Sequence, residues 1–415
     1  MSKNYPRWQA QCVKKALKTR RVVIISGARQ TGKTTLAQQV SDKNTDYRTL
    51  DDTDLFALAM EDPKGFIKNV KNSSKTMIID EIQKAPKLIP EIKMVVDRDN
   101  RNGQYLLTGS ANIQTMPSVT ESLAGRVKNI RLRPLSVGET LEAKPTFLKR
   151  AFEKNFPTKI SGCDKQEIVN LAFRGGYPEA IRIKNPAERK EWYKDYIKTL
   201  IEHDLRDIAN IRRQGALQEL LGILASWSAK FMDLAAIGSS LSLTKPTLES
   251  YINWLVSLYL FEKVSPWIRT DYDRVGKKAK LYAADTGIMT SILGWEPKET
   301  MLNHDRSGKL VETFVFQELA AQVDINGEYS LYQYRDREKR EIDFIVERED
   351  GALLGVEVKA GHSVSSEDFE PQKWFAANIV KNKKPYISIV LYSGERVLSF
   401  GENLLAVPIS ALWTE

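Results

Sequence analysis

Residues 22–35 read Val22-Val23-Ile24-Ile25-Ser26-Gly27-Ala28-Arg29-Gln30-Thr31-Gly32-Lys33-Thr34-Thr35, and this stretch decides the fold. An apolar run typical of a β-strand ends in Gly-x-x-x-x-Gly-Lys-Thr, and a helix-compatible run follows at residues 36–40. A strand, a glycine-rich loop and a helix are the context that a phosphate-binding P-loop requires. The two glycines permit backbone conformations that a β-carbon would penalise, so the loop N–H groups can point at a phosphate.

This loop predicts a nucleotide site with ATP and Mg²⁺ as cofactors. Lys33 would reach the β- and γ-phosphates and take part in catalysis, and the Thr34 hydroxyl would be a ligand of Mg²⁺. The residues that we expect to bind the nucleotide are Gly27, Ala28, Arg29, Gln30, Thr31, Gly32, Lys33, Thr34 and Thr35.

Two later apolar runs end in polar residues that suit the same chemistry. The run at residues 77–79 ends in Asp80 and Glu81. Asp80 fits a Mg²⁺-coordinating acid, and Glu81 fits the carboxylate that orients or deprotonates the attacking water. Thr108 or Ser110, at the end of a strand expected next to that of Asp80, would sense the γ-phosphate or position the water, and a simple strand-end turn is the alternative. Strands that alternate with helices predict a parallel sheet with its ligand at the carboxyl ends of the strands.

Arg126 follows in the segment Leu123-Ala124-Gly125-Arg126. It is a candidate arginine finger that would act on the nucleotide of a neighbouring subunit, which would imply a homo-oligomer, either a ring or a dimer. The alternative is a structural or solvated arginine.

Composition narrows the class of protein. A chain of 415 residues is expected to hold about two to four domains. No apolar run approaches the roughly eighteen residues that a membrane span needs, and the first residues lack an apolar signal core. Two cysteines form no disulfide framework and favour a cytoplasmic location. The net charge of +9 is a mild bias toward polyanions, although many proteins with such a charge bind no nucleic acid.

The middle of the chain suggests a linker, a helical lid and a DNA-binding module. Residues 141–168 are mixed and lysine-rich, and residues 188–210 carry a long, charged helix pattern. Residues 231–254 have the character of a helix–turn–helix, with Thr244 as the cap of a second helix. A hairpin could follow, and its basic loop would resemble the wing of a winged helix; its cations are Arg274, Lys277, Lys278 and Lys280. A winged helix that serves only in protein packing is the alternative.

The last part of the chain carries an Asp…Glu-x-Lys pattern. Asp343 lies in one predicted strand, and Glu357 and Lys359 share one face of another, because side chains alternate along a strand. Asp343 and Glu357 would hold a divalent metal, with Glu312 of the preceding helix as a third acid. Lys359 would stabilise the developing negative charge on a phosphate. A nuclease-like fold without activity, used in binding or assembly, is the alternative.

Together these residues resemble a widespread prokaryotic family of AAA-plus-type ATPases with a C-terminal region of unknown function. The resemblance covers nearly the whole chain and rests on 27–35, 79–83, 107–110, 123–126 with 134–136, 174–178, 280–287, 341–343 and 357–359. It implies ATP binding, a winged helix and a restriction-endonuclease-like C-terminal fold. It implies no particular substrate or pathway.

The expected architecture is α/β, with a P-loop NTPase sheet in residues 1–140 and a linker and helical region in 141–228. A winged helix would occupy 229–300, and a nuclease-like domain would occupy 301–415. The leading hypothesis is a Mg²⁺-dependent ATPase that acts on or with DNA. One rival is a nucleotide-controlled assembly module that does not cut, and another is a nuclease whose ATPase core is mainly a switch.

Overall fold

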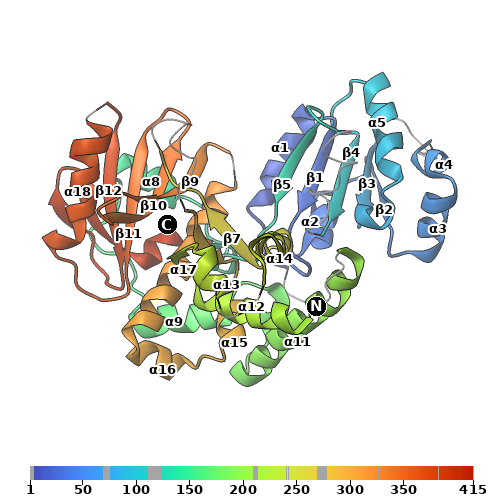
Figure 1. Ribbon diagram of the computed structural model, residues 1–415. Helices are drawn as coiled ribbons and strands as arrows, with labels where there is room; N and C mark the ends of the chain where they lie inside the picture. Colours follow the sequence, from blue (N-terminus) through green and yellow to red (C-terminus); the bar gives the residue numbers. More distant parts are fainter. Residues whose placement is uncertain are drawn as a thin grey trace. The chain divides into compact units, whose positions relative to one another are not determined.

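The computed structural model describes residues 4–68, 75–110, 123–208, 214–239, 241, 243–268, 278–325, 327–381 and 383–414. The chain forms two compact units. The first comprises Met1–Leu135 with Ser257–Tyr259, and the second comprises Ser136–Val256 with Leu260–Glu415. In Figure 1 the colours follow the chain from the N-terminus (blue) to the C-terminus (red).

The first unit is built on a five-stranded parallel sheet in the order β2-β3-β4-β1-β5. Its strands are β1 (Val22–Ser26), β2 (Thr45–Thr49), β3 (Thr76–Asp80), β4 (Tyr105–Gly109) and β5 (Val127–Arg131). Its helices are α1 (Gln9–Thr19), α2 (Lys33–Val40), α3 (Thr53–Glu61), α4 (Pro63–Lys68), the 3-10 turn η1 (Ile82–Lys84) and α5 (Leu88–Arg98). This arrangement confirms the predicted parallel α/β sheet.

Helices cover both faces of this sheet. Val23 and Ile25 of β1 lie in one apolar cluster with residues of α1 and α2. Val22 and Ile24 point the other way, into a cluster with residues of α3, α4 and α5. A strand that is buried on both faces reads as a continuous apolar run, which is why residues 22–25 carry no polar alternation.

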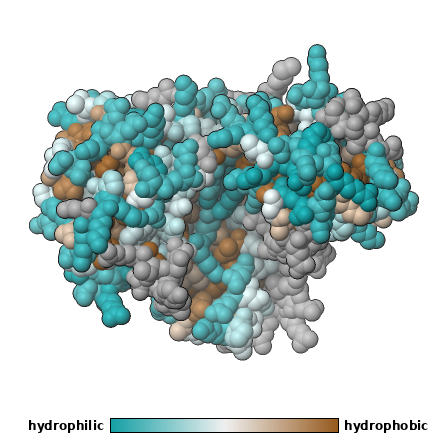
Figure 2. All heavy atoms as spheres, turned by 90° about the horizontal axis from the view of Figure 1, so that it is seen from above, coloured by the Kyte–Doolittle hydropathy of each residue, from teal (hydrophilic) through white to brown (hydrophobic). Residues whose placement is uncertain are grey.

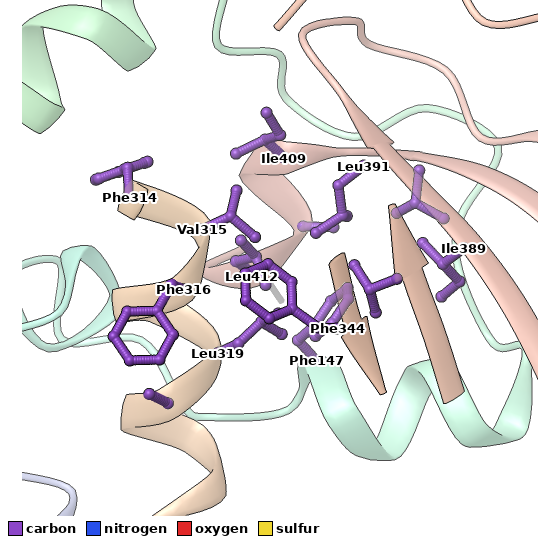
Figure 3. Close-up of a cluster of buried hydrophobic side chains, with 14 of the residues drawn as sticks. Phe147, Phe314, Val315, Phe316, Leu319, Phe344, Ile389, Leu391, Ile409 and Leu412 are labelled. Atoms are coloured by element: carbon purple, nitrogen blue, oxygen red, sulfur yellow. The ribbon is translucent and has the colours of Figure 1, made fainter. Parts of the chain in front are cut away.

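The second unit begins with a series of helices, the first three of which contribute side chains to the core of the C-terminal domain. They are α7 (Val137–Thr140), α8 (Phe147–Glu153), α9 (Lys165–Arg174), α10 (Pro178–Arg182), α11 (Pro186–Ile208) and α12 (Gln214–Ser226). Phe147 of α8 is fully buried beside Phe344 of the C-terminal sheet (Figure 3). Residues 141–168 were expected to be a linker, and that expectation fails because the apolar side chains of α8 and α9 complete this core.

A small sheet with helices follows α12. It contains β6 (Lys230–Phe231), α13 (Leu234–Gly238), α14 (Lys245–Ser257), β7 (Phe261–Val264) and β8 (Lys280–Ala283), with strand order β6-β8-β7. Both strand pairs are antiparallel. The expected helix pair and hairpin are therefore present, while Arg274 and Lys277 of the predicted wing lie outside the described residues.

Two motifs of the sequence meet at the start of α15 (Thr286–Ile292). Asp285 caps this helix and also accepts the N–H of Gly176 at 2.7 Å. Gly175 has a left-handed φ of 67°, and a β-carbon there would lie 2.1 Å from the Tyr193 hydroxyl oxygen. Close packing and backbone conformation therefore explain the glycine at position 175.

The C-terminal domain is a six-stranded mixed sheet in the order β13-β14-β12-β11-β10-β9. Its strands are β9 (Tyr329–Arg335), β10 (Glu341–Arg348), β11 (Leu353–Lys359), β12 (Tyr386–Tyr392), β13 (Leu398–Gly401) and β14 (Leu404–Pro408). Its helical segments are α16 (Pro297–Leu302), α17 (His304–Val323), η4 (Ser366–Phe369), α18 (Glu370–Phe375), η5 (Ala376–Val380) and η6 (Ile409–Leu412). Apolar side chains of α17 pack on one face of the sheet (Figure 3).

Hydrophilic side chains dominate the face of the molecule that Figure 2 shows, and hydrophobic residues appear there only in small areas. Within the part of the chain that the structure describes, no helix combines the length and apolar content needed to cross a membrane.

Candidate functional site

The loop after β1 takes backbone conformations that its sequence permits. Gly32 has a φ of 96°, and it precedes the first residue of α2. At Gly27, a β-carbon would lie 2.2 Å from the carbonyl oxygen of Leu132, so only glycine fits there. Gln30 is also left-handed, with a φ of 61°. The N-terminus of α2 thus faces the loop, as anion binding at a helix start requires.

A buried arginine that no sequence pattern indicated braces this loop. Arg7 donates from Nη1 to the Thr31 carbonyl oxygen at 2.7 Å and from Nη2 to the Arg133 carbonyl oxygen at 2.6 Å. The side chain therefore ties the loop to the segment that follows β5. Arg7 sits among other basic residues near the N-terminus, and nothing local in the sequence distinguishes it from them.

Lys33 lies inside the loop with its ammonium group turned inward. Its Nζ donates to the Ala28 carbonyl oxygen at 2.8 Å, and the residue is only 5% exposed. Burial lowers the pKa of Lys33 to about 8, while the negative charges of Glu81 and Asp80 oppose this shift. A phosphate next to this group would favour its charged form.

Asp80, at the end of β3, is the centre of the polar contacts in this site. Thr34 donates from Oγ1 to the two carboxylate oxygens at 2.9 and 3.2 Å, and the Tyr47 hydroxyl donates at 3.0 Å. Thr108, from the neighbouring strand β4, donates to the same carboxylate. Burial, with the Asp80 charge as the next cause, raises the pKa of Tyr47 to about 12. Carboxylate and hydroxyl oxygens are hard ligands, so Asp80 and Thr34 fit Mg²⁺.

Strand β3 ends at Asp80, and the chain turns at Glu81. Its backbone is left-handed, with a φ of 60°, and its N–H donates to the Thr108 hydroxyl oxygen at 3.2 Å. Its carboxylate accepts a hydrogen bond from the Gln83 amide. A non-glycine residue in this conformation costs about 1–3 kcal/mol, and such strain clusters at functional sites. The structure therefore brings Lys33, Thr34, Asp80, Glu81 and Thr108 together at the carboxyl edge of one sheet.

Arg126 lies at the opposite edge of this sheet. The N–H of Val22 donates to the Arg126 carbonyl oxygen at 3.3 Å, which places Arg126 beside the start of β1 rather than its end. Its guanidinium contacts Asp97 and donates to the Ala124 carbonyl oxygen at 3.0 Å. Arg126 therefore does not face the P-loop of its own chain, and its action on a neighbouring subunit stays a prediction.

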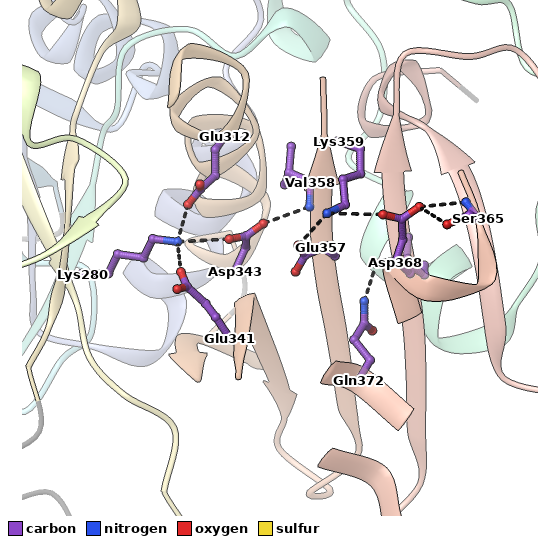
Figure 4. A network of polar contacts seen from close by, with 11 residues as sticks. Lys280, Glu312, Glu341, Asp343, Glu357, Val358, Lys359, Ser365, Asp368 and Gln372 are labelled. Atoms are coloured by element: carbon purple, nitrogen blue, oxygen red, sulfur yellow. Dashed lines mark hydrogen bonds and ion pairs between the residues drawn. The ribbon is translucent and has the colours of Figure 1, made fainter. Parts of the chain in front are cut away.

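The C-terminal acids converge on a lysine that the sequence analysis placed elsewhere. Lys280 was expected to face DNA from a wing, and this is wrong: it belongs to β8 and is 1% exposed. Its Nζ lies 2.6 Å from Oε1 of Glu312, 2.6 Å from Oε1 of Glu341 and 3.0 Å from Oδ1 of Asp343 (Figure 4). These contacts join residues more than thirty positions apart, so no local pattern could reveal them.

Glu357 and Lys359 form the neighbouring half of this network (Figure 4). Lys359 Nζ lies 3.3 Å from Oε1 of Glu357 and 3.4 Å from Oδ1 of Asp368. Asp343 accepts the Val358 N–H at 3.0 Å through Oδ2. Burial, followed by the charge of Asp343, raises the pKa of Glu357 well above its ordinary value.

Glu312 also sits in an environment that disfavours its charge. Burial, followed by repulsion from Asp343, raises its pKa to about 7, and the ammonium of Lys280 opposes that shift. Asp343, Glu357 and Glu312 were predicted as metal ligands, and these residues do lie in one region. Among the residues that the structure describes, however, no three His, Cys, Asp or Glu side chains are arranged to hold a metal ion.

Comparison with known protein families divides the chain into three matched segments. Residues 19–141 match the family described as an AAA domain. Residues 165–299 and 307–412 match the domains of unknown function DUF8612 and DUF4143.

Relatives extend over most of the chain. An uncharacterised protein of Mycobacterium tuberculosis is 26% identical over 403 residues, which cover 97% of this chain and 83% of the relative. An uncharacterised protein of Methanocaldococcus jannaschii is 23% identical over 350 residues, covering 81% of this chain and 74% of the relative. Among solved structures, a Walker-type ATPase of Pyrococcus abyssi aligns with a TM-score of 0.41 and 15% identity, covering 68% of this chain and 94% of that chain.

Proposed function

We propose that the protein binds ATP with Mg²⁺ and hydrolyses the bond between the β- and γ-phosphates. The premise is that residues 19–141 form an AAA-type P-loop ATPase domain. The observation that carries this proposal is the convergence on Asp80. Hydroxyl groups from α2 and β4 meet its carboxylate at the end of β3, next to the loop that holds Lys33. These are the parts that phosphoryl transfer needs, because catalysis there is mostly positioning and charge stabilisation.

Each residue would take a distinct role. Lys33 binds the β- and γ-phosphates, and the loop N–H groups with the start of α2 hold the phosphate oxygens. Thr34 and Asp80 would hold Mg²⁺, which supplies charge neutralisation between the phosphates when it is bound. Glu81 orients the attacking water and accepts its proton, and Thr108 positions both Asp80 and the Glu81 backbone.

The test is the Glu81→Gln variant, assayed for ATP binding and for phosphate release. Loss of a general base should reduce turnover about 10²- to 10⁴-fold while nucleotide affinity persists. Glu61→Gln, an exposed acid at the end of α3, is the matched control and should keep the parent rate. Turnover by Glu81→Gln at the parent rate would reject the role of Glu81.

The proposal extends to DNA as a partner. The order α12, β6, α13, α14, β7, β8 supports a winged helix, in which the third helix would enter the major groove. Leu248, Ile252 and Leu255 of α14 are buried. Lys245, Ser250 and Asn253 are exposed. An exposed polar face on this helix supports DNA contact.

DNA binding can be measured by fluorescence anisotropy over a range of salt concentrations. Lys245→Glu should weaken binding and reduce the salt slope by about 0.9 for each phosphate contact that is lost. Lys198→Glu, an exposed lysine of α11, gives the same charge change at another surface. Equal effects of the two variants would reject α14 as the DNA-contacting helix.

The order of elements in the C-terminal domain supports a nuclease-like fold. Helix α17 precedes three strands, and α18 connects them to β12. One observation favours a second candidate function, a nucleotide-controlled binding or assembly module in the cytoplasm that does not cut. The acids of the C-terminal domain already contact a lysine ammonium. In this view Arg126 would serve a ring or dimer, and DNA left intact while ATP turns over would be the expected outcome.

A further inference from the structure

We propose that the ammonium of Lys280 is the resident cation of the C-terminal acidic site, in the place that a divalent metal would take. The inference rests on the nuclease-like fold proposed above, and it does not depend on ATP turnover. The carboxylates of Glu312, Glu341 and Asp343 surround the Lys280 Nζ at 2.6, 2.6 and 3.0 Å, respectively. The Lys280 side chain is 2% exposed, compared with 10% for Asp343 and 16% for Glu312, so its charge is almost fully removed from water.

An ammonium group and a metal ion cannot share these acids. A metal would need lone pairs of the same oxygens at about 2.0–2.2 Å, and Lys280 supplies only donors. Glu312 Oε1 also accepts the Tyr282 hydroxyl at 2.6 Å, and Asp343 Oδ2 accepts the Val358 N–H. Oε1 of Glu312 and both carboxylate oxygens of Asp343 therefore already accept hydrogen bonds, and a divalent ion beside Lys280 would add repulsion between like charges.

The surroundings of Lys280 hold the ammonium in this position. Its Nζ lies 5.6 Å from the ring centre of Phe231 and 5.9 Å from that of Tyr282. The Tyr282 ring stacks on Phe316 of α17 with ring centres 4.4 Å apart, and it lies 5.5 Å from Phe344 of β10. Strand β8 is thus fastened to α17 and β10 by an ionic contact and an aromatic contact side by side.

The chain contains a matched comparison two residues away. Lys278 is exposed and pairs with Asp233 at 2.7 Å, on the surface of the small sheet. Lys278 and Lys280 belong to the same basic segment of sequence, yet only Lys280 meets a group of buried acids. Removal of Lys278 therefore changes the charge of this segment without opening the acidic site.

The consequence is that the C-terminal domain neither binds nor uses a divalent metal at Asp343. In place of catalysis, Lys280 links the small sheet to the C-terminal sheet, so that the two move together. Two of the acids that were predicted to hold a metal, Glu312 and Asp343, instead contact Lys280.

The experiment is a Mn²⁺ titration followed by the spectrum of free Mn²⁺ in electron paramagnetic resonance. All proteins carry Asp80→Asn and are free of nucleotide, so that the P-loop site adds no bound metal. The parent, Lys278→Met and Lys280→Arg should bind no Mn²⁺ at the C-terminal site, because each keeps a cation there. Lys280→Met should bind one more equivalent of Mn²⁺, and its unfolding temperature should rise with Mn²⁺ while that of the parent does not.

A second comparison decides the question if Lys280→Met does not fold. Asp343→Asn is compared with the parent in the same titration. Equal Mn²⁺ binding by the two supports the inference, because Asp343 then holds no metal. A Mn²⁺ equivalent that is present in the parent and lost in Asp343→Asn would overturn it, as would a folded Lys280→Met protein that gains none.

Discussion

Asp80 in the ATPase unit and Asp343 in the C-terminal domain are both buried carboxylates on strands, and they differ in what faces them. Hydroxyl groups of Thr34, Tyr47 and Thr108 donate to Asp80. An ammonium, that of Lys280, faces Asp343. A hydroxyl oxygen keeps lone pairs and can become a metal ligand, whereas an ammonium has none. A carboxylate on a strand therefore does not define a metal site until its partners are known.

A large effect on turnover is expected at Lys33, which tests the ATPase side of this comparison. Lys33→Ala removes the cation that would contact the β- and γ-phosphates, so turnover should fall by about 10²- to 10³-fold. Phosphate release at saturating ATP measures the effect. Lys14→Ala removes an exposed lysine from α1 and serves as the control. Parent-like turnover in Lys33→Ala would show that the loop does not work as a P-loop.

The next effect concerns stability, and it compares two lysines of one segment. Lys280→Met leaves three carboxylates without their cation and should cost about 3–5 kcal/mol of unfolding free energy in metal-free buffer. Lys278→Met breaks an exposed ion pair and should cost at most about 1 kcal/mol. Chemical denaturation at fixed pH gives both values. Equal losses would remove the distinction between a buried cation and a surface one.

A smaller effect on the free energy of unfolding is expected at Glu318, another buried acid. Its carboxylate accepts the Val137 N–H at 2.9 Å. Burial raises the pKa of Glu318 from an ordinary value of 4.5 to about 8. Between these values the folded state holds the proton more tightly than the unfolded state, so stability falls as pH rises.

The Glu318→Gln substitution removes this dependence on pH. Its unfolding temperature relative to the parent should be higher at about pH 8.5 than at about pH 5. Glu402→Gln, an exposed acid near the C-terminus, should show no such difference. If the relative unfolding temperature of Glu318→Gln is the same at both pH values, Glu318 does not carry the proton that its burial implies.

Sequence alone predicted the ATPase sheet well, because its signals are local. Neighbouring residues alone are enough to interpret the apolar run at residues 22–25, the glycines of the loop and the acids after residue 79. The sequence also placed Thr108 on the strand beside that of Asp80, which the pairing of β3 with β4 confirms.

What the sequence could not predict depends on contacts between distant residues. Lys280 belongs to a basic run and looks like a surface residue, but it lies 32 positions before Glu312 and packs against it. Arg7 braces a carbonyl group 126 residues away. The segment that looked like a linker contributes Phe147 to the C-terminal core, since apolar residues spread thinly along a chain give a weak signal.

Counting the Mn²⁺ ions that are bound in the presence of a non-hydrolysable ATP analogue decides which acids hold the metal. The parent should bind one Mn²⁺ for each nucleotide, Asp80→Asn should lose it, and Asp343→Asn should keep it. Mn²⁺ that persists in Asp80→Asn and disappears in Asp343→Asn would contradict the account, because the C-terminal acids would then hold the metal that we assign to the ATPase site.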